Sequence, residues 1–349
     1  MKIGIIGCGT IANAQHIRTY LLNKKAEIKY FCDIIPERAE KAVRDYGCGI
    51  AVTDYKQVLA DDEIVAVSVC TPNHMHAQIA IEALNAGKHV LCEKPAARVF
   101  SEALEMQEAQ HKTGKVLNIG VVNRFNMGVN KIKALIDAGA LGEVYQVYVS
   151  FRSHRSIPGL GGDFTNKAVA GGGVTIDWGV HFFDIVMYCC GDPLVKTVSA
   201  EKFCRLGNPI SEYTYTSMWA GPPKEDGVCD VEEGITGMAR TDGPVITFNG
   251  AWAQNIGENE MFIDFMGTKG GIRLQYGADF VLYSTQNGML SKTEFKMQKD
   301  DMFQNEIDRF IDCIEKGETL PSHIDTNIIT ARMMDAIYRS AEEHREIVL

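Results

Sequence analysis

The sequence predicts an α/β protein that has an N-terminal Rossmann dinucleotide-binding domain and a C-terminal α+β domain with a large, mostly antiparallel open sheet. Three observations lead to this fold class. Short apolar segments alternate with amphipathic ones over residues 1–123, which is typical of parallel strands joined by helices. A glycine-rich turn occupies residues 7–12, between the first strand and the first helix. From residue 144 onward, strand-like segments follow one another without helices, which indicates antiparallel pairing.

The first domain is expected to alternate strands with helices. Apolar, β-branched runs predict strands over Lys2–Ile6, Glu27–Cys32, Ile64–Cys70, Lys88–Cys92 and Val116–Ile119. Helical periodicity predicts helices over Thr10–Leu22, Pro36–Tyr46, His74–Asn85 and Ser101–Lys112.

The second domain begins with a short amphipathic helix over Met127–Ala138, which Gly139 ends. Enrichment in aromatic and β-branched residues predicts strands over Val144–Phe151, Lys196–Phe203, Glu232–Ala239, Val245–Trp252, Met261–Met266, Gly271–Gln275 and Phe280–Ser284. Two further helices are expected over Met302–Glu315 and Asn327–Glu343.

Length and composition narrow the class of protein. The 349 residues predict two domains, placed at 1–123 and 124–349. The net charge of −10 and the absence of a Lys/Arg block argue against nucleic acid as a partner. No secretory signal and no apolar run long enough to span a membrane is recognised. The ten cysteines show no zinc-binding spacing and suit a reducing cytoplasm, so no metal site is predicted.

The turn Gly7-Cys8-Gly9-Thr10-Ile11-Ala12 matches the dinucleotide-binding fingerprint with Ala in its third position. The first Gly permits a tight turn, the second lets the backbone approach a pyrophosphate, and Ala12 allows close packing of helix on sheet. Asp33 ends the second strand, where a carboxylate bonds the ribose hydroxyls of NAD and repels the 2′-phosphate of NADP. A turn or capping role is the alternative for Asp33, and nearby Arg38 could accommodate a phosphate. We expect NAD rather than NADP.

Two loops that follow strands carry further candidates. In Thr71-Pro72-Asn73-His74-Met75-His76, we expect Thr71, Pro72, Asn73 and His76 to contact the cofactor, because ligands bind beyond the carboxyl ends of parallel strands. A helix cap explains Asn73 equally well. In Glu93-Lys94-Pro95, the ammonium group of Lys94 could hydrogen-bond a substrate hydroxyl, and a surface lysine in a turn is the alternative.

A glycine-led helix starts at Gly171-Gly172-Gly173 and supplies acid–base groups. Asp177, His181 and Asp184 are spaced i, i+4 and i+7, which places them on one helix face. Two carboxylates and an imidazole on one stripe suit proton transfer, whereas a structural histidine held by acidic neighbours is the alternative. Another face, at Ile176, Val180, Phe183 and Met187, is expected to be buried.

Taken together, these motifs make the chain resemble the glucose–fructose oxidoreductase/inositol dehydrogenase (Gfo/Idh/MocA) family. The resemblance rests on GCGTIA at 7–12, TPNHMH at 71–76, AGKHVLCEKP at 86–95, Asn123-Arg124-Phe125 and GGGVTIDWGVH at 171–181. It implies Lys94, Asp177 and His181 as catalytic residues and Asp184 as a contact for substrate hydroxyls. Some relatives carry Tyr at the position of His181. Glu93 and Asn123 are further expected cofactor contacts, and Arg124, Asn166 and Trp178 are expected substrate contacts.

The expected function is oxidation of a secondary hydroxyl of a sugar, a glycoside (at its 3-hydroxyl) or a cyclic polyol by NAD. Two alternatives stay open. One is a redox-neutral enzyme that cleaves glycosides through transient oxidation by tightly held NAD, and the other is an NAD(H)-binding sensor without turnover. The resemblance also implies a homodimer or homotetramer formed through the sheet of the second domain.

Overall fold

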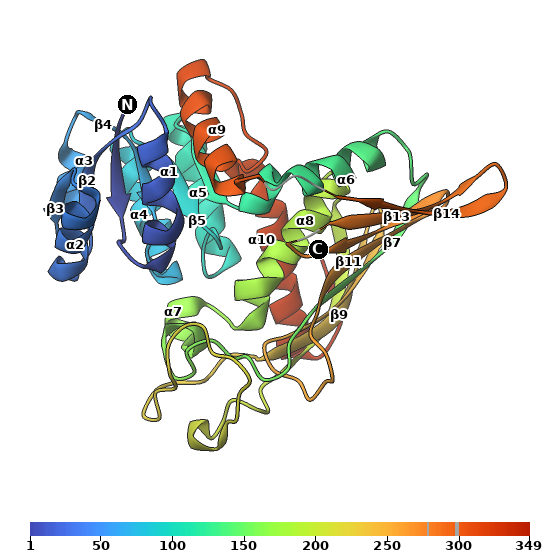
Figure 1. Ribbon diagram of the computed structural model, residues 1–349. Helices are drawn as coiled ribbons and strands as arrows, with labels where there is room; N and C mark the ends of the chain where they lie inside the picture. Colours follow the sequence, from blue (N-terminus) through green and yellow to red (C-terminus); the bar gives the residue numbers. More distant parts are fainter. Residues whose placement is uncertain (278, 297–299) are drawn as a thin grey trace. The chain divides into compact units, whose positions relative to one another are not determined.

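The computed structural model describes residues 1–277, 279–296 and 300–349, and the chain divides into two compact units. The first unit comprises Met1–Phe125 and Asp301–Ile328, and the second comprises Asn126–Asp300 and Ile329–Leu349. A parallel sheet forms the first unit and a large, mostly antiparallel sheet forms the second (Figure 1), so the predicted fold class is confirmed.

Six parallel strands form the sheet of the first unit within its described residues. Their order in the sheet is β3-β2-β1-β4-β5-β6. The chain therefore passes from one side of β1 to the other between β3 and β4, as in dinucleotide-binding sheets. The strands are β1 (Lys2–Ile6), β2 (Glu27–Cys32), β3 (Ile50–Val52), β4 (Ile64–Val69), β5 (His89–Glu93) and β6 (Leu117–Gly120).

Helices connect these strands. They are α1 (Ile17–Leu22), α2 (Pro36–Tyr46), α3 (Tyr55–Ala60), α4 (His76–Asn85) and α5 (Phe100–Thr113), with short 3₁₀ turns η2 (Asn73–Met75) and η3 (Val122–Phe125). The helix predicted over 10–22 is helical throughout, and a π-helical turn, η1 (Ala12–His16), interrupts it after Ile11. The side chain of Asn13 donates from Nδ2 to the carbonyl oxygens of Cys8 and Gly9, both at 2.8 Å, and so ties this turn to the glycine-rich loop.

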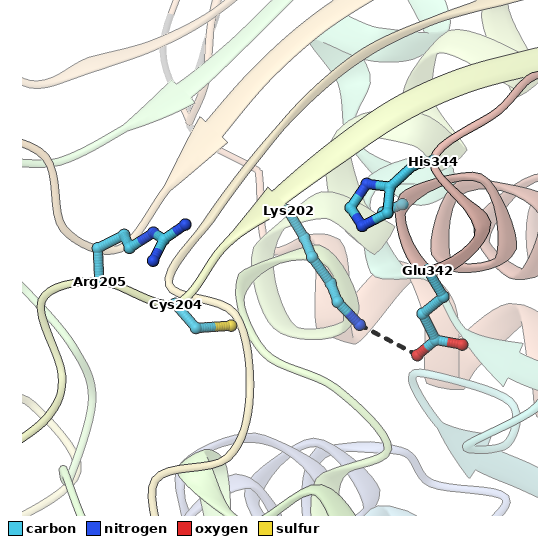
Figure 2. Close-up of a pocket in the computed structure, with 6 residues that line it drawn as sticks. Lys202, Cys204, Arg205, Glu342 and His344 are labelled. Carbon is cyan, nitrogen blue, oxygen red and sulfur yellow. Dashed lines mark hydrogen bonds and ion pairs between the residues drawn. The ribbon is translucent and has the colours of Figure 1, made fainter.

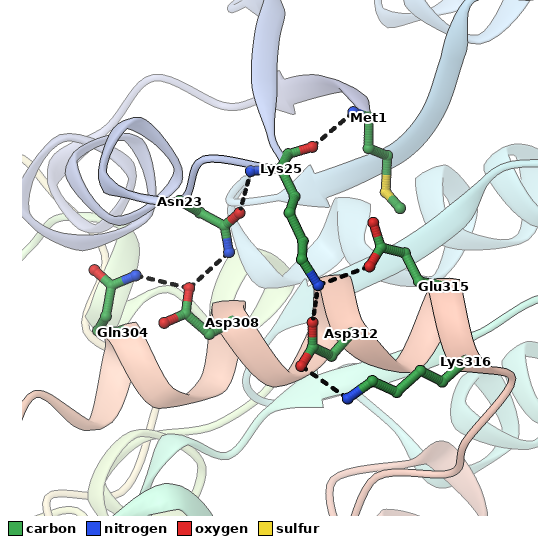
Figure 3. A network of polar contacts seen from close by, with 8 residues as sticks. All are labelled: Met1, Asn23, Lys25, Gln304, Asp308, Asp312, Glu315 and Lys316. Atoms are coloured by element: carbon green, nitrogen blue, oxygen red, sulfur yellow. Dashed lines mark hydrogen bonds and ion pairs between the residues drawn. The ribbon is translucent and has the colours of Figure 1, made fainter.

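Helix α9 (Met302–Lys316) belongs to the first unit although it lies far along the chain. It lies beside α1 (Figure 1), and its buried residues Ile307, Phe310 and Ile311 join the core of that unit. Lys25 donates to Asp312 at 2.7 Å and to Glu315 at 2.8 Å, within the polar network of Figure 3. The sequence-based boundary assigns this helix to the second domain. Its amphipathic pattern does not reveal which of two cores its apolar face enters.

The second unit is built on a nine-stranded sheet, counted over its described residues, in the order β14-β13-β12-β11-β7-β10-β9-β8-β15. Neighbouring strands pair antiparallel except β10 and β7, which pair in parallel. The strands are β7 (Val144–Arg152), β8 (Val195–Phe203), β9 (Gly234–Thr241), β10 (Val245–Ala251), β11 (Glu260–Gly267), β12 (Gly270–Gln275), β13 (Phe280–Gln286), β14 (Met289–Phe295) and β15 (Ile347–Val348).

The helices of this unit are α6 (Met127–Asp137), α7 (Lys167–Ala170), α8 (Val180–Cys189) and α10 (Ile324–Glu343), whose first residues up to Ile328 belong to the first unit. Short turns η4 (Asp163–Thr165), η5 (Thr175–Gly179) and η6 (Ile210–Glu212) complete it. Buried residues of α6, α8 and α10 share one core with the sheet. Phe151 of β7 stacks on Phe182 of α8 with ring centroids 5.1 Å apart and meets Phe183 edge-on at 5.8 Å. The face predicted to be buried is buried: Ile176, Val180, Phe183 and Met187 are at most 4% exposed. Across the described residues, no helix is both long and apolar enough to cross a membrane.

Candidate active site

Three expected site loops follow neighbouring strands of the parallel sheet. Strands β1, β4 and β5 are adjacent and parallel, and Gly7, Thr71 and Lys94 come within two residues of their carboxyl ends. Because parallel strands present their carboxyl ends at one edge, the sheet brings the three loops to that edge. In sheets of this kind, dinucleotides bind beyond that edge.

Glycine is needed at the two fingerprint positions for different physical reasons. Gly7 has φ +93°, and a Cβ there would lie 2.5 Å from the carbonyl oxygen of Cys70, so only glycine fits. A Cβ on Gly9 would find no atom of the described residues within 4 Å, apart from its chain neighbours. The backbone at Gly9 therefore faces open space at the start of a helix, which suits the approach of a pyrophosphate.

Asp33 lies against the same turn. It is 7% exposed, and its Oδ2 accepts a hydrogen bond from the backbone N–H of Cys8 at 2.9 Å. Its Oδ1 accepts one from the N–H of Ile35 at 2.9 Å, which is the turn role weighed as the alternative. Arg38, in the first turns of α2, is exposed. The carboxylate is thus fixed beside the fingerprint loop, and its contact with a ribose stays a prediction.

His76 joins two of the site loops. It is 1% exposed, with Nδ1 2.8 Å from the carbonyl oxygen of Pro95 and Nε2 2.8 Å from that of Thr71. Burial lowers the pKa of His76, and a neutral ring donates to one carbonyl at a time. This histidine connects the 71–76 loop to the Glu-Lys-Pro turn. Thr71, Pro72 and Asn73 lie on the loop that it anchors.

Lys94 is half-buried, and its backbone is held by the residue before it. Oε2 of Glu93 accepts the N–H of Lys94 at 3.1 Å, while Oε1 lies 2.8 Å from Nε2 of His16. Both His16 and Glu93 are buried, at 0% and 7% exposure. The carboxylate of Glu93 contacts His16 and the backbone of Lys94, and the contact with the cofactor that the sequence analysis expects of Glu93 stays a prediction.

The glycine-led helix starts with a π-helical turn over Thr175–Gly179 and continues as α8. Buried Glu232 holds its start: Oε2 accepts the N–H of Gly173 at 3.0 Å, and Oε1 accepts that of Thr175 at 3.1 Å and the hydroxyl of Tyr338 at 2.8 Å. A Cβ on Gly173 would lie 1.9 Å from the carbonyl oxygen of Glu232. Glycine is therefore required at position 173 by the close approach of the Glu232 backbone, while the Glu232 carboxylate satisfies N–H groups at the helix N-terminus.

The acid–base residues of this helix differ in burial. Asp177 is 8% exposed, and half-buried His181 has its ring centroid 6.4 Å from that of Tyr276. Asp184 is only 1% exposed, and the Thr330 hydroxyl lies 3.5 Å from its Oδ1. The structure thus places Asp184 deeper in the second unit than His181.

The other predicted cofactor and substrate contacts differ in burial and in the bonds that their side chains make. Arg124 is 1% exposed and donates from Nη1 to the carbonyl oxygen of Pro321 at 2.7 Å, and neighbouring Asn123 is 7% exposed. The side chain of Asn166 caps α7 by accepting the N–H of Ala168 at 3.0 Å. Trp178 is half-buried in the π-helical turn.

Sequence reasoning missed the buried partners of these residues. His16 and Glu232 bond Glu93 and the glycine run from distant parts of the chain, 77 and 59 residues away. Glu306 of α9 is 1% exposed, and neither of its carboxylate oxygens has a hydrogen-bond partner among the described residues. For His16 and Glu306, the signal that could have found them is an ionisable residue at a buried position of a helix. Glu232 lies outside the helices and strands, and no local pattern marks it.

A pocket of about 410 Å³ opens on the second unit (Figure 2). Lys202 pairs there with Glu342 at 3.0 Å. None of the predicted site residues lines it; its lining is Lys202, Cys204, Arg205, Ala341, Glu342 and His344.

Two family models match consecutive parts of the chain. Residues 1–121 match the oxidoreductase family with an NAD-binding Rossmann fold, and residues 129–273 match the GFO/IDH/MocA C-terminal domain. The chain belongs to the GFO/IDH/MocA oxidoreductase family. The predicted resemblance to this family is therefore confirmed. The predicted enzyme class, an NAD(P)-dependent dehydrogenase that acts on CH–OH groups, is confirmed as well.

Relatives within the GFO/IDH/MocA family are similar over long stretches. D-glucoside 3-dehydrogenase of Escherichia coli K12 is 29% identical over 352 aligned residues, covering 100% of this chain and 97% of that protein. Levoglucosan dehydrogenase of Pseudarthrobacter phenanthrenivorans is 29% identical, over 71% of this chain and 65% of that protein. A solved levoglucosan dehydrogenase in complex with NADH and levoglucosan has a TM-score of 0.87 at 23% identity and covers 100% of this chain and 99% of that one. At this identity the structural match shows the shared fold.

Proposed function

We propose that this protein oxidises a secondary hydroxyl of a glycoside or related sugar and uses NAD as the hydride acceptor. One observation carries the proposal: neighbouring parallel strands bring the fingerprint turn at Gly7 and the backbone of Lys94 to one edge of a dinucleotide-type sheet. The sugar substrate is supported by the full-length similarity to a D-glucoside 3-dehydrogenase. A cyclic polyol such as inositol is the next substrate to test.

The first unit fits a dinucleotide. The open space at Gly9, the N-terminus of the helical segment at Ala12 and the fixed carboxylate of Asp33 would hold its pyrophosphate and adenosine ribose. Contacts from Thr10, Ile11, Arg38, residues 71–76 and Asn123 complete this proposal. A carboxylate at Asp33 favours NAD over NADP because it repels a 2′-phosphate. When bound, the nicotinamide supplies a hydride acceptor.

Proton transfer is assigned to the chain's own residues. We assign His181 as the general base that takes the hydroxyl proton, and Asp177 as the group that orients the imidazole and the substrate. The ammonium group of Lys94 would hydrogen-bond the same oxygen and stabilise its developing negative charge. Asp184, Trp178, Asn166 and Arg124 are proposed substrate contacts, of which Trp178 suits stacking on a sugar ring.

We propose that the outer face of the second sheet forms a homodimer or homotetramer. Strand residues that alternate with the buried ones lie on this face, and they mix apolar and charged groups. The guanidinium of Arg273 lies 4.1 Å from the ring centroid of Phe262 and pairs with Asp264, while Tyr148 packs on Phe262 at 5.8 Å. Such a mixture of aromatic and arginine side chains is common in protein interfaces. All ten cysteines, each among the described residues, are free thiols, which supports a cytoplasmic location.

The substrate proposal is tested by a panel of purified compounds with NAD and with NADP, followed by the absorbance of the reduced cofactor. The panel contains methyl α- and β-D-glucopyranoside, levoglucosan, D-glucose and myo-inositol. The proposal expects the highest kcat/KM for one of the glycosides with NAD. Absence of reduction across the whole panel would contradict it. Copurifying NAD that does not exchange, together with glycoside cleavage, would favour the redox-neutral alternative.

A further inference from the structure

The carboxylate of Glu93 connects two segments of the first unit. Glu93 is the last residue of β5, and its Oε1 lies 2.8 Å from Nε2 of His16, the last residue of η1. Its Oε2 accepts the backbone N–H of Lys94 at 3.1 Å. One buried carboxylate therefore joins the helical segment that follows the fingerprint turn to the backbone of Lys94.

His16 is itself fixed in orientation. Its side chain is fully buried, and its Nδ1 lies 3.4 Å from the hydroxyl of Ser68 in β4. That hydroxyl lies 2.8 Å from the hydroxyl of Tyr20 in α1. Rotation of the imidazole would break contacts to both Glu93 and Ser68, so the ring holds the carboxylate in one place.

The sheet restricts the carboxylate from its other side. Gly120 of β6 pairs with Glu93, and a Cβ on Gly120 would lie 3.2 Å from Cα and Cδ of Glu93 and 3.3 Å from its Oε1. These distances are shorter than ordinary carbon contacts. The absence of a side chain at Gly120 therefore leaves just the room that the Glu93 side chain occupies.

We propose that Glu93 and His16 are positioning residues for Lys94, which they hold in register with the helical segment of the nucleotide-binding turn. This inference rests on the proposed function of Lys94. Stability alone does not explain why an ion pair occupies this buried position, because a buried ion pair is seldom more stabilising than an apolar pair of the same volume. The position of Lys94 does explain it. The Glu93 carboxylate fixes the backbone N–H of Lys94, and a displacement of about 1 Å in a catalytic group can lower the rate about 10²-fold.

The first test compares Glu93→Ala with Glu93→Gln, using the panel glycoside that gives the highest kcat/KM. Glutamine can still accept the N–H of Lys94 through Oε1 and donate to a neutral His16 through Nε2. We expect Glu93→Gln to keep kcat within about threefold and Glu93→Ala to lower it about 10²-fold. KM and the Kd of NADH should stay within about threefold in both variants. Glu82→Ala, which removes a carboxylate bonded to Tyr55, is the matched control and should leave kcat unchanged.

The second test repeats Glu93→Ala in a Lys94→Ala background. A positioning residue acts through Lys94, so the second substitution should lower the residual kcat by less than about twofold. An equal loss of kcat in both backgrounds would overturn the proposal, as would a normal kcat for Glu93→Ala. Normal turnover of Lys94→Ala itself would instead show that the proposed function of Lys94 fails.

Gly120→Ala provides a second route if Glu93→Ala does not fold. Its added Cβ pushes on Glu93 without removing either partner, so kcat should fall while NADH still binds. In the Lys94→Ala background the same substitution should have no further effect on kcat. A normal kcat for Gly120→Ala in folded protein would count against the proposal.

Discussion

Nε2 of His16 lies 2.8 Å from Oε1 of Glu93, and the two side chains are 0% and 9% exposed. Burial alone would lower the pKa of His16, but Cys70 and the Glu93 carboxylate outweigh burial and raise it to about 10. Burial likewise raises the pKa of Glu93, but its hydrogen bond and attraction to His16 reverse the direction and lower it. Each partner therefore holds the other in its charged form, and one of them, Glu93, directly precedes Lys94 in the chain.

This ion pair predicts a pH dependence of stability. Because the pKa of His16 is higher in the folded chain (about 10) than its ordinary 6.5, its contribution is complete below pH 6.5 and is lost as the pH rises through about 10. The contribution of Glu93, whose pKa is lowered, is present above its ordinary 4.5 and is lost as the pH falls through its folded value. The stabilising contributions of His16 and Glu93 are therefore both complete between pH 4.5 and 6.5.

Urea unfolding at several pH values measures this effect. The neutral double variant His16→Gln/Glu93→Gln lacks both charges. The difference in free energy of unfolding between the wild type and this variant should shrink as the pH rises from about 6 to about 9. A constant difference between wild type and double variant would contradict the assignment of charge to His16.

Glu306 predicts the opposite behaviour for a single carboxyl. Burial, followed by repulsion from Glu93, raises its pKa well above the ordinary 4.5. The folded chain thus keeps a proton that the unfolded chain releases, so stability falls as the pH rises above 4.5. The amide in Glu306→Gln does not titrate. The free energy of unfolding of this variant should therefore rise relative to that of the wild type, by up to about 1.4 kcal/mol for each unit of increasing pH. Thermal unfolding of this variant and of the exposed control Glu108→Gln measures the gain, and equal slopes in the two would refute it.

Asp33 predicts the choice between cofactors. Asparagine at this position keeps one acceptor oxygen, so it can accept the N–H of Cys8 or that of Ile35 but not both, and it no longer repels a 2′-phosphate. Asp33→Asn should therefore tighten NADPH binding relative to NADH by about tenfold. Fluorescence titration with each cofactor measures the ratio of Kd values, with Asp45→Asn in α2 as the control. An unchanged ratio would remove Asp33 from cofactor selection.

Glu232 predicts the stability of the glycine-led helix. Glu232→Ala removes three hydrogen-bond acceptor contacts and leaves buried N–H groups unpaired, so it should destabilise the protein by about 2–4 kcal/mol. Tyr338→Phe removes one of these contacts and should cost about 1 kcal/mol. Chemical denaturation compares the two. A smaller loss for Glu232→Ala than for Tyr338→Phe would show that the acid does not hold the helix start.

The sequence predicted elements whose signals are local. Strand β2 and helix α2 begin and end at the predicted residues, because their apolar patterns and the early proline lie within the elements themselves. Strands β3 and β15 are only three and two residues long, and they form by pairing with an existing edge. The parallel pairing of β10 with β7 joins residues about 100 positions apart, which no local pattern encodes.

The same distinction applies to the candidate site. The residues proposed to react stand in recognisable motifs, such as Lys94 after a buried strand and His181 on a helix. Their supports are visible only after folding, because His16 and Glu232 bond segments distant in the chain. The burial of Asp184 could not be predicted from spacing either, since the π-helical turn at 175–179 changes the helix phase ahead of α8.

Steady-state kinetics of Lys94→Ala, His181→Ala and the double variant tests the central claim most directly, namely that these two residues act on the same hydroxyl. Each single variant should lower kcat by about 10²–10⁴ while NADH binding persists. The double variant should lose little more than the more impaired single one, as expected of groups that act as a unit. Turnover close to wild type in either single variant would contradict the account.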